Sequence, residues 1–479
     1  MLDDMARTRP TLDILPNLHT LEWLYDDIKC MDRAILFMHQ RVRHLVISPL
    51  YNKVKSPFFV DACARMPHIH LLDLRGRHSV RLIEADVLEI LRGLPDLKKV
   101  IFPEFYLTST LFSELSRKKR ICAIKFEREA KQGLGDEKDV DSFAPVLQEG
   151  AFPALRELDI TARLGDFVRM MNADYAPVNI TSLCISTYVE QKPRELHSFL
   201  VTLSVHCRLL STLRIKLLHV SGSLKPKLTS ARQIAFDTLR PLFLFQKLTT
   251  FEVMHKYPIN IALEEVEELA RRWPSLENLY LNKEPLVMSD CTLDLRALVP
   301  FARHCPKLRC LGLFMDATAA KIHTTRELKP FSALEVLSVG TSQARDAGTV
   351  AAFLSFMCPP ECKLDVDMTW TSHGGRSCHQ LHDDLMLEIQ NRSTPWKRVK
   401  DLLPLFIHLW REEREKSKAL QREIESLRAR NGLPIKPEVN FRVMPVNDSD
   451  SMVPRSRSHN KRMRKMLISL TKDDECIIS

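Results

Sequence analysis

Two stretches of the chain, Trp273-Pro-Ser-Leu-Glu-Asn-Leu-Tyr-Leu281 and Cys305-Pro-Lys-Leu-Arg-Cys-Leu-Gly-Leu313, share one spacing of apolar residues. In each, an apolar residue is followed by two variable residues, a second apolar residue, one variable residue and a third apolar residue. The last two apolar side chains lie two positions apart, so they fall on the same face of a short strand. The proline ahead of the pattern disfavours helical backbone at the residue before it, which ends any preceding helix.

The same spacing occurs twelve times, about 29 residues apart on average. Between copies, apolar residues recur at helical spacing, as in the stretch from Leu263 to Ala270. Each unit is therefore predicted to hold a helix, a stop and a short strand, and such a period is typical of leucine-rich repeats. The copies begin at Leu18, Val42, Ile69, Leu97, Ile121, Leu155, Ile180, Leu210, Leu248, Leu276, Leu308 and Leu334.

Stacked units of this kind place parallel strands on a concave face and helices on a convex face. The sequence therefore predicts an α/β fold, a leucine-rich-repeat solenoid (horseshoe) of about twelve irregular repeats over residues 1–370. A loop and capping helix at 371–395, a long charged amphipathic helix at 396–432 and a disordered basic tail at 433–479 are expected to follow. The alternative is a conventional α/β domain whose strands are alike.

Further repeats at Leu15–Trp23 and Phe152–Ile160 carry the same signature, and a Trp-Lys-x-Val…Leu-Leu-Pro-x-Phe element lies at Trp396–Phe406 ahead of a charged helix. Together these features resemble the F-box/leucine-rich-repeat-like proteins of fungi. In that family an F-box binds the adaptor Skp1 within a cullin ligase, and the repeats hold a substrate for ubiquitination. The resemblance implies a protein-protein interaction module related to the substrate receptors of ubiquitin ligases.

Two features depart from this family. The first repeat begins at Leu18, and Met1–Pro16 is too short to supply the adaptor-binding F-box. An open solenoid end also exposes apolar side chains, so we expect residues upstream of Met1, a partner or a second copy to cover it. The Asn or Cys that usually stands three residues after the last apolar position is replaced in six repeats, by Asp26, Arg77, Phe105, Arg163, Glu284 and Asp316.

Composition narrows the function classes. Only 13 of 479 residues are glycine, and the chain has no G-x-G-x-x-G, G-x-x-x-x-G-K-S/T or H-E-x-x-H motif, so we expect neither an enzyme nor a cofactor. No apolar run reaches the roughly 20 residues of a membrane helix, and no secretory signal is evident. Twelve scattered cysteines then indicate reduced thiols and a cytoplasmic or nuclear location.

A zinc site could be assembled from five residues: Cys358, Cys362, His373, Cys378 and His379. Buried structural thiols are the preferred interpretation of the cysteines among them.

A protein partner is expected on the concave face, where variable residues of the pattern point away from the core. Eight such residues are candidate contacts: Glu22, His44, Asp73, Arg156, Arg214, Glu252, Tyr280 and Arg309.

The C-terminal region suggests further partners. Self-association through Leu420, Ile424 and Leu427 is one hypothesis. A nuclear import signal at Lys461, Arg462, Arg464 and Lys465 is another, while the lack of interleaved aromatic residues argues against nucleic acid. The alternatives to a ligase subunit are a stand-alone repeat scaffold unrelated to ubiquitin and a nuclear factor with a basic tail.

Overall fold

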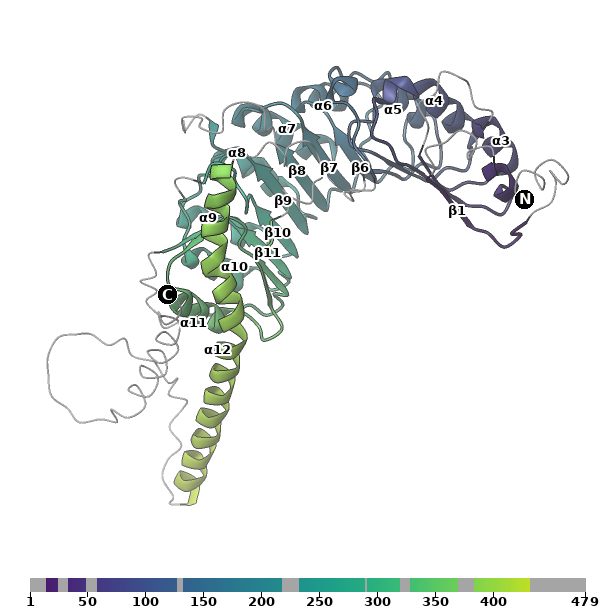
Figure 1. Cartoon of the computed structure of the whole chain (residues 1–479). Helices are drawn as coiled ribbons and strands as arrows, with labels where there is room; N and C mark the ends of the chain where they lie inside the picture. Colours follow the sequence, from purple (N-terminus) through teal and green to yellow (C-terminus); the bar gives the residue numbers. More distant parts are fainter. Residues whose placement is uncertain are drawn as a thin grey trace.

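The computed structural model describes residues 14–24, 33–48, 58–126, 132–217, 232–288, 291–318, 328–368 and 383–430. Thirteen parallel strands form one sheet in sequence order, and a short two-stranded sheet lies beside its C-terminal part. The large sheet bends into an arc with strands along the inner side and helices along the outer side (Figure 1). The predicted leucine-rich-repeat solenoid is therefore confirmed.

The thirteen strands of the large sheet are β1 (Thr20–Trp23), β2 (His44–Ile47), β3 (Leu71–Leu74), β4 (Lys99–Phe102), β5 (Ala123–Phe126), β6 (Glu157–Thr161), β7 (Ser182–Thr187), β8 (Thr212–Leu217), β9 (Thr250–His255), β10 (Asn278–Leu281), β11 (Cys310–Leu313), β13 (Val336–Ser338) and β15 (Lys363–Asp365). The small sheet pairs β12 (Asp316–Ala317) with β14 (Gln343–Ala344). The helices are α3 (Phe58–Arg65), α4 (Glu84–Gly93), α5 (Ser109–Ser116), α6 (Leu164–Met171), α7 (Pro193–His206), α8 (Phe236–Leu239), α9 (Leu263–Arg272), α10 (Leu298–His304), α11 (Ala347–Met357) and α12 (Asp383–Arg430). Short 3-10 helices include η3 (Glu137–Val140) and η5 (Arg240–Leu244).

The structure has one repeat strand more than the twelve that the apolar pattern predicts. The register pairs Leu337 of β13 with Leu364 of β15, which places Glu361 where the other repeats begin with an apolar residue. The missing first apolar residue hides this last repeat in the sequence.

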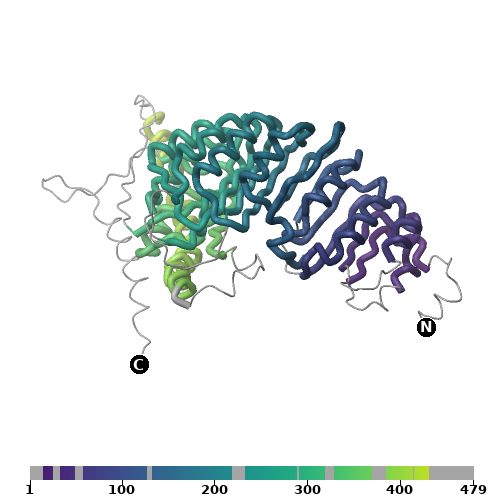
Figure 2. The backbone as a smooth tube through the Cα atoms, turned by 90° about the horizontal axis from the view of Figure 1, so that it is seen from above, coloured from purple at the N-terminus to yellow at the C-terminus, as the bar shows by residue number. Residues whose placement is uncertain are grey.

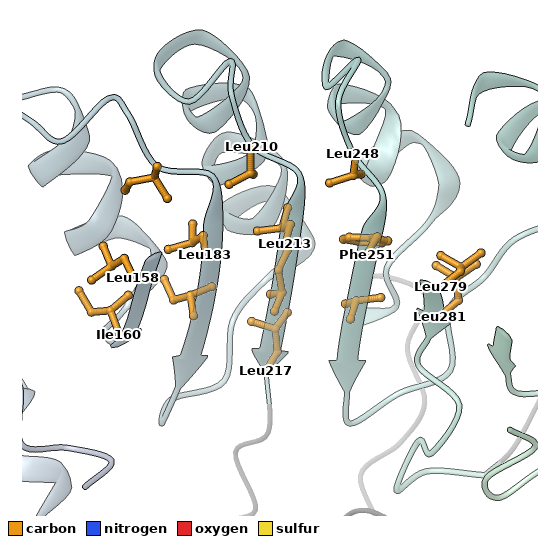
Figure 3. Packing of buried hydrophobic residues seen from close by; sticks show 14 of the residues in the cluster. Leu158, Ile160, Leu183, Leu210, Leu213, Leu217, Leu248, Phe251, Leu279 and Leu281 are labelled. Atoms are coloured by element: carbon orange, nitrogen blue, oxygen red, sulfur yellow. The ribbon is translucent and has the colours of Figure 1, made fainter. Parts of the chain in front are cut away.

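The core lies between the sheet and the outer helices. Leu158, Leu183, Leu213 and Phe251 occupy equivalent positions in successive strands and are fully buried. Figure 3 shows these side chains stacked from one repeat to the next beneath the helices. Because each fully buried side chain of this size contributes about 1.5–3 kcal/mol, the stability of the arc is the sum of many contacts between neighbouring repeats.

A second feature of every repeat is the residue just after its first apolar position. We call these residues the start row: His19, Arg43, His70, Lys98, Cys122, Arg156, Thr181, Ser211, Thr249, Glu277, Arg309, Glu335 and Cys362. From His19 to Arg309, each accepts a backbone hydrogen bond from the next member, as in His70 N to Arg43 O at 2.7 Å and Lys98 N to His70 O at 2.9 Å, and Glu335 O accepts from Lys363 N, the residue after Cys362. The start row is therefore a continuous backbone ladder that fixes the order of its side chains in space.

The predicted proline stops follow α3, α4, α9 and α10, as the spacing requires. Phe152-Pro153 is different, because the described residues between β5 and β6 form η3 and irregular turns rather than an α-helix. The predicted helix ahead of this proline is therefore wrong.

The C-terminal helix differs from the expected pair of helices. The sequence predicts a boundary at 395/396, but α12 is one helix from Asp383 to Arg430 with Pro395 and Pro404 inside it. Its first half packs on α11, and Trp396 Nε1 donates a 3.0 Å hydrogen bond to Ser342 O. Figure 2 shows this helix against the C-terminal end of the solenoid. Residues 371–382 of the predicted loop and capping helix, and the predicted tail at 433–479, lie outside the described residues.

Candidate functional site

The inner face of the sheet carries the side chains that point away from the core. In each strand the fifth residue of the pattern lies between two buried residues and therefore faces the opposite side. We call these residues the inner row: Glu22, Val46, Asp73, Ile101, Lys125, Asp159, Cys184, Arg214, Glu252, Tyr280, Gly312, Ser338 and Asp365. Among the described elements, the α-helices of the repeats lie on the other side of the sheet (Figure 1).

Ion pairs cross between strands on this face. Arg214 Nε lies 3.4 Å from Glu252 Oε2, and both residues are partly exposed. Arg75 Nη1 lies 3.1 Å from Glu22 Oε1, and Lys125 pairs with Glu157. The predicted contacts Glu22, Arg214 and Glu252 are thus on the inner face, but each already has a partner within the chain.

The predicted contact His44 is exposed in β2, one residue after the start row, with Nδ1 3.4 Å from Thr20 Oγ1. Asp73, in contrast, is buried, and its carboxylate is held by Arg75 at 3.1 Å and by Gln132 Nε2 at 3.0 Å. Gln132 comes from the segment between β5 and β6, which the repeat pattern does not describe. Asp73 therefore serves contacts within the solenoid rather than an open surface.

Two predicted contacts lie elsewhere on the solenoid. Arg156 and Arg309 are exposed members of the start row, before β6 and β11, and not of the inner row. Arg309 makes a two-pronged ion pair with Glu335 at 2.8 and 3.0 Å, while Arg156 Nη1 donates to Asn179 O at 3.3 Å. They belong to the edge of the sheet where the strands begin.

The last predicted contact, Tyr280, borders a buried ionic cluster. Lys283 Nζ lies 2.8 Å from Glu284 Oε1, 3.3 Å from Asp365 Oδ2 and 2.8 Å from Ser338 Oγ, and the Tyr280 ring lies beneath it. The Lys283 and Glu284 side chains are 9% and 1% exposed. Gly312 leaves room for the cluster, because a Cβ there would come within 2.4 Å of the Tyr280 ring.

The pKa of Asp365 shows that the cluster stabilises the charged carboxylate. Burial acts to raise this pKa, but the hydrogen bond from Ser338 and the charge of Lys283 outweigh it, so the pKa lies below its usual value. The spacing within a repeat carries no signal for this cluster, because its members come from three different repeats.

Asn282 takes over part of the role of the missing asparagines. It follows β10 directly, two positions earlier than the expected place, and has a positive φ of 45°. Its Oδ1 accepts a 2.8 Å hydrogen bond from His255 N, and its Nδ2 donates to Tyr257 O at 2.7 Å. The side chain thereby satisfies buried backbone groups of the preceding repeat.

The buried His255 beside it makes stability depend on pH. Burial lowers the pKa of His255 to about 4, from an ordinary 6.5. The unfolded chain therefore binds this proton first, so about 3 kcal/mol of stability present above pH 6.5 should be lost as the pH falls toward 4. Urea unfolding at pH 7.0, 5.5 and 4.5 measures the loss, and H255Q should show a shallower profile. Parallel profiles for the two proteins would contradict the assignment.

The described residues contain no group of three or more His, Cys, Asp or Glu that could hold a metal ion, and His373, Cys378 and His379 lie outside them. Cys358 and Cys362 are buried free thiols.

A hollow of about 480 Å³ is lined by residues around α8 and the start of α9, away from the inner row. Within the described part of the chain, no helix is long and apolar enough to cross a membrane.

The C-terminal predictions are placed only in part. Leu420, Ile424 and Leu427 are exposed on α12, where the helix extends beyond the repeats (Figure 1). Self-association through them stays a prediction. Lys461, Arg462, Arg464 and Lys465 lie outside the described residues.

Comparison with known proteins yields fold-level similarity alone. No protein-family model and no curated protein matches the chain. Among solved structures, it is similar to the Rad7 and Elc1 complex of yeast, with 12% identity, a TM-score of 0.38, and coverage of 71% of this chain and 78% of the other. It is also similar to the leucine-rich repeat-containing protein LegL7 from Legionella pneumophila, with 14% identity, a TM-score of 0.37, and coverage of 62% and 91%. A third, the LRIM1/APL1C complex, has 10% identity, a TM-score of 0.29, and coverage of 93% and 73%.

Proposed function

We propose that this chain is a non-enzymatic, protein-binding repeat module that holds its partner on the inner face of the sheet. The observation that supports this proposal is the inner row itself. Parallel sheets in enclosed α/β domains are covered by helices on both faces. Here the repeat helices cover one face, and the other presents half-exposed polar and charged side chains on β5 and β6 and again on β8 to β10.

The ion pairs on this face suit recognition better than stability. Partly exposed pairs such as Glu22–Arg75 and Arg214–Glu252 contribute about 1 kcal/mol or less to folding. A partner that offers its own charged groups can therefore replace these ion pairs with little loss of folding free energy. Complementary charges then decide which partner binds. Tyr280 adds an aromatic surface of the type that is enriched in protein interfaces.

A double variant tests this face directly. R214A/E252A removes one cross-strand pair and keeps the net charge, and it should lose at least about 90% of the partners captured by the tagged wild-type chain from its own cells. D237A/R240A is the matched control, because it removes an exposed ion pair of 3.0 Å between Asp237 of α8 and Arg240, the first residue of η5. Quantitative mass spectrometry of the captured proteins is the measurement. Equal loss in both variants, or in neither, would refute an inner-face site.

The resemblance to fungal F-box/leucine-rich-repeat-like proteins supports a narrower proposal, in which the captured partner is a substrate for ubiquitination. The same capture separates the alternatives. Skp1 and a cullin above a tagged control favour a ubiquitin-ligase substrate receptor. Enrichment of other proteins without them favours a stand-alone scaffold, or the nuclear factor that the basic tail suggests.

A further inference from the structure

The start row is divided into three zones by charge. Its first zone is cationic, with Arg43, His70 and Lys98 on successive strands, followed by Cys122 and Arg156. The middle zone carries hydroxyl groups, and the last zone alternates in sign from Glu277 to Glu335. The middle residues are Thr181, Ser211 and Thr249, and the last are Glu277, Arg309, Glu335 and Cys362.

The cations of the first zone have no acidic partner among the described residues. Arg43 Nη1 donates to the backbone oxygens of Gln40 and Val42, and Lys98 makes no ion pair there. Lys99, beside Lys98 at the start of β4, is likewise without a described carboxylate partner. In the last zone, by contrast, Arg309 and Glu335 neutralise each other at 2.8 Å. The last zone therefore contains an ion pair of opposite charges, whereas the first zone holds several cations close together without a described acidic partner.

The pKa of His70, between Arg43 and Lys98 in the start row, is shifted by the positive charges around it. Burial lowers the pKa of His70, and the charges of Lys98 and Arg43 lower it further. The nearby Asp96 opposes this effect, but its carboxylate is already held by His68 at 2.8 Å and by Arg120. Like charges on adjacent strands destabilise a sheet, so this arrangement costs stability unless an anion neutralises it.

We propose that Arg43, His70, Lys98 and the adjacent Lys99 form a binding site for an acidic protein segment. Strands lie about 4.8 Å apart, so the cations from Arg43 to Lys98 span about 10 Å, the length of about three residues of extended chain. Two carboxylates on alternate residues of such a segment lie about 6.7 Å apart, so each can reach a cation of the site. The proposal rests on the protein-binding function above and names the chemistry of one part of the partner.

The site favours a peptide over a nucleic acid. Binding of single strands uses aromatic side chains on which bases stack, and the start row of β2 to β6 has none. Asp96 and Glu157, the latter one residue after Arg156, also interrupt the cations and would repel a continuous line of phosphates. An acidic segment with spaced carboxylates needs no aromatic side chains for stacking, and it presents no continuous line of negative charge to Asp96 and Glu157.

Fluorescence anisotropy with the full chain and three labelled probes tests the proposal. The probes are a twelve-residue peptide of alternating Glu and Ser, the same peptide with Gln for Glu, and a twelve-nucleotide thymidine strand. The chain should bind the Glu peptide and not the Gln peptide, with an affinity that falls as salt rises. K98Q/K99Q should weaken Glu-peptide binding by about tenfold or more. K307Q/K363Q, which removes two exposed lysines near the last zone, should change it by less than about twofold.

Three outcomes would overturn the proposal. These are equal weakening by both double variants, no binding of the Glu peptide, and tighter binding of the thymidine strand that K98Q/K99Q abolishes. Unfolding temperatures of the variants confirm that the fold is intact. Since R214A/E252A should leave Glu-peptide binding unchanged, failure of this site is distinguishable from failure of the inner-face function.

Discussion

Replacing Trp396 with alanine is expected to lower the free energy of unfolding of the last repeats by about 3–5 kcal/mol. Trp396 is fully buried where α12 meets the solenoid, and its indole Nε1 donates to Ser342 O at 3.0 Å. The alanine leaves a cavity in the contact between α12 and α11 and removes the bond to Ser342, so the helix should detach. Hydrogen exchange should then become faster in α11, β15 and the first half of α12.

Two companion variants show whether packing or the hydrogen bond dominates. W396F keeps most of the ring and removes the N–H donor, so it should cost about 1 kcal/mol for the bond, plus a small packing term. Leu405 is exposed on the same helix, and L405A should change stability by less than about 0.5 kcal/mol. If W396A proves no worse than L405A, α12 does not seal the solenoid as the structure indicates.

The second large effect is expected at Lys283. K283M removes the cation but keeps an unbranched side chain of similar length, and it leaves the buried Glu284 and the half-buried Asp365 without their countercharge. Breaking a buried ion pair in this way costs about 3–5 kcal/mol, because it leaves a buried negative charge without compensation by the cation. Urea unfolding together with hydrogen exchange in β10 to β15 measures the loss.

The cause can be separated from lost packing. K283M/E284Q removes the orphaned charge as well, so it should recover a large part of the lost stability. K363M, on exposed Lys363 of the same sheet, is the control and should be nearly neutral. A double variant as unstable as K283M alone would show that the loss arises from packing rather than from charge.

The fold was predictable because the repeat is local. A strand followed by a helix needs only about 29 residues, and spacing such as Leu276, Leu279 and Leu281 marks the strand unambiguously. The last repeat escaped detection because Glu361 replaces its first apolar residue. The sequence predicts a boundary at 395/396, whereas α12 continues through Pro395, and the buried Trp396 follows this proline within the helix.

The candidate site was less predictable, for a different physical reason. The pattern shows correctly that Glu22, Arg214 and Glu252 face inward, but ion pairs depend on which repeats become neighbours. Gln132 reaches Asp73 from 59 positions along the chain, and Lys283 reaches Asp365 from 82. Spacing within one repeat carries no information about such contacts. The charge zones of the start row, in contrast, can be read from the sequence once the register is known.

The helix α12 makes the two ends of the arc mechanically unequal. Among the described strands, β1 borders β2 alone, whereas the last repeats are held by their neighbours and also by α12. A chain of units that support each other only in pairs frays from its weaker end. Under force or mild denaturant, the repeats should therefore peel away in order from β1, and the region around Trp396 should be the last to open. The cationic zone would then be lost early, and the buried Lys283 cluster late.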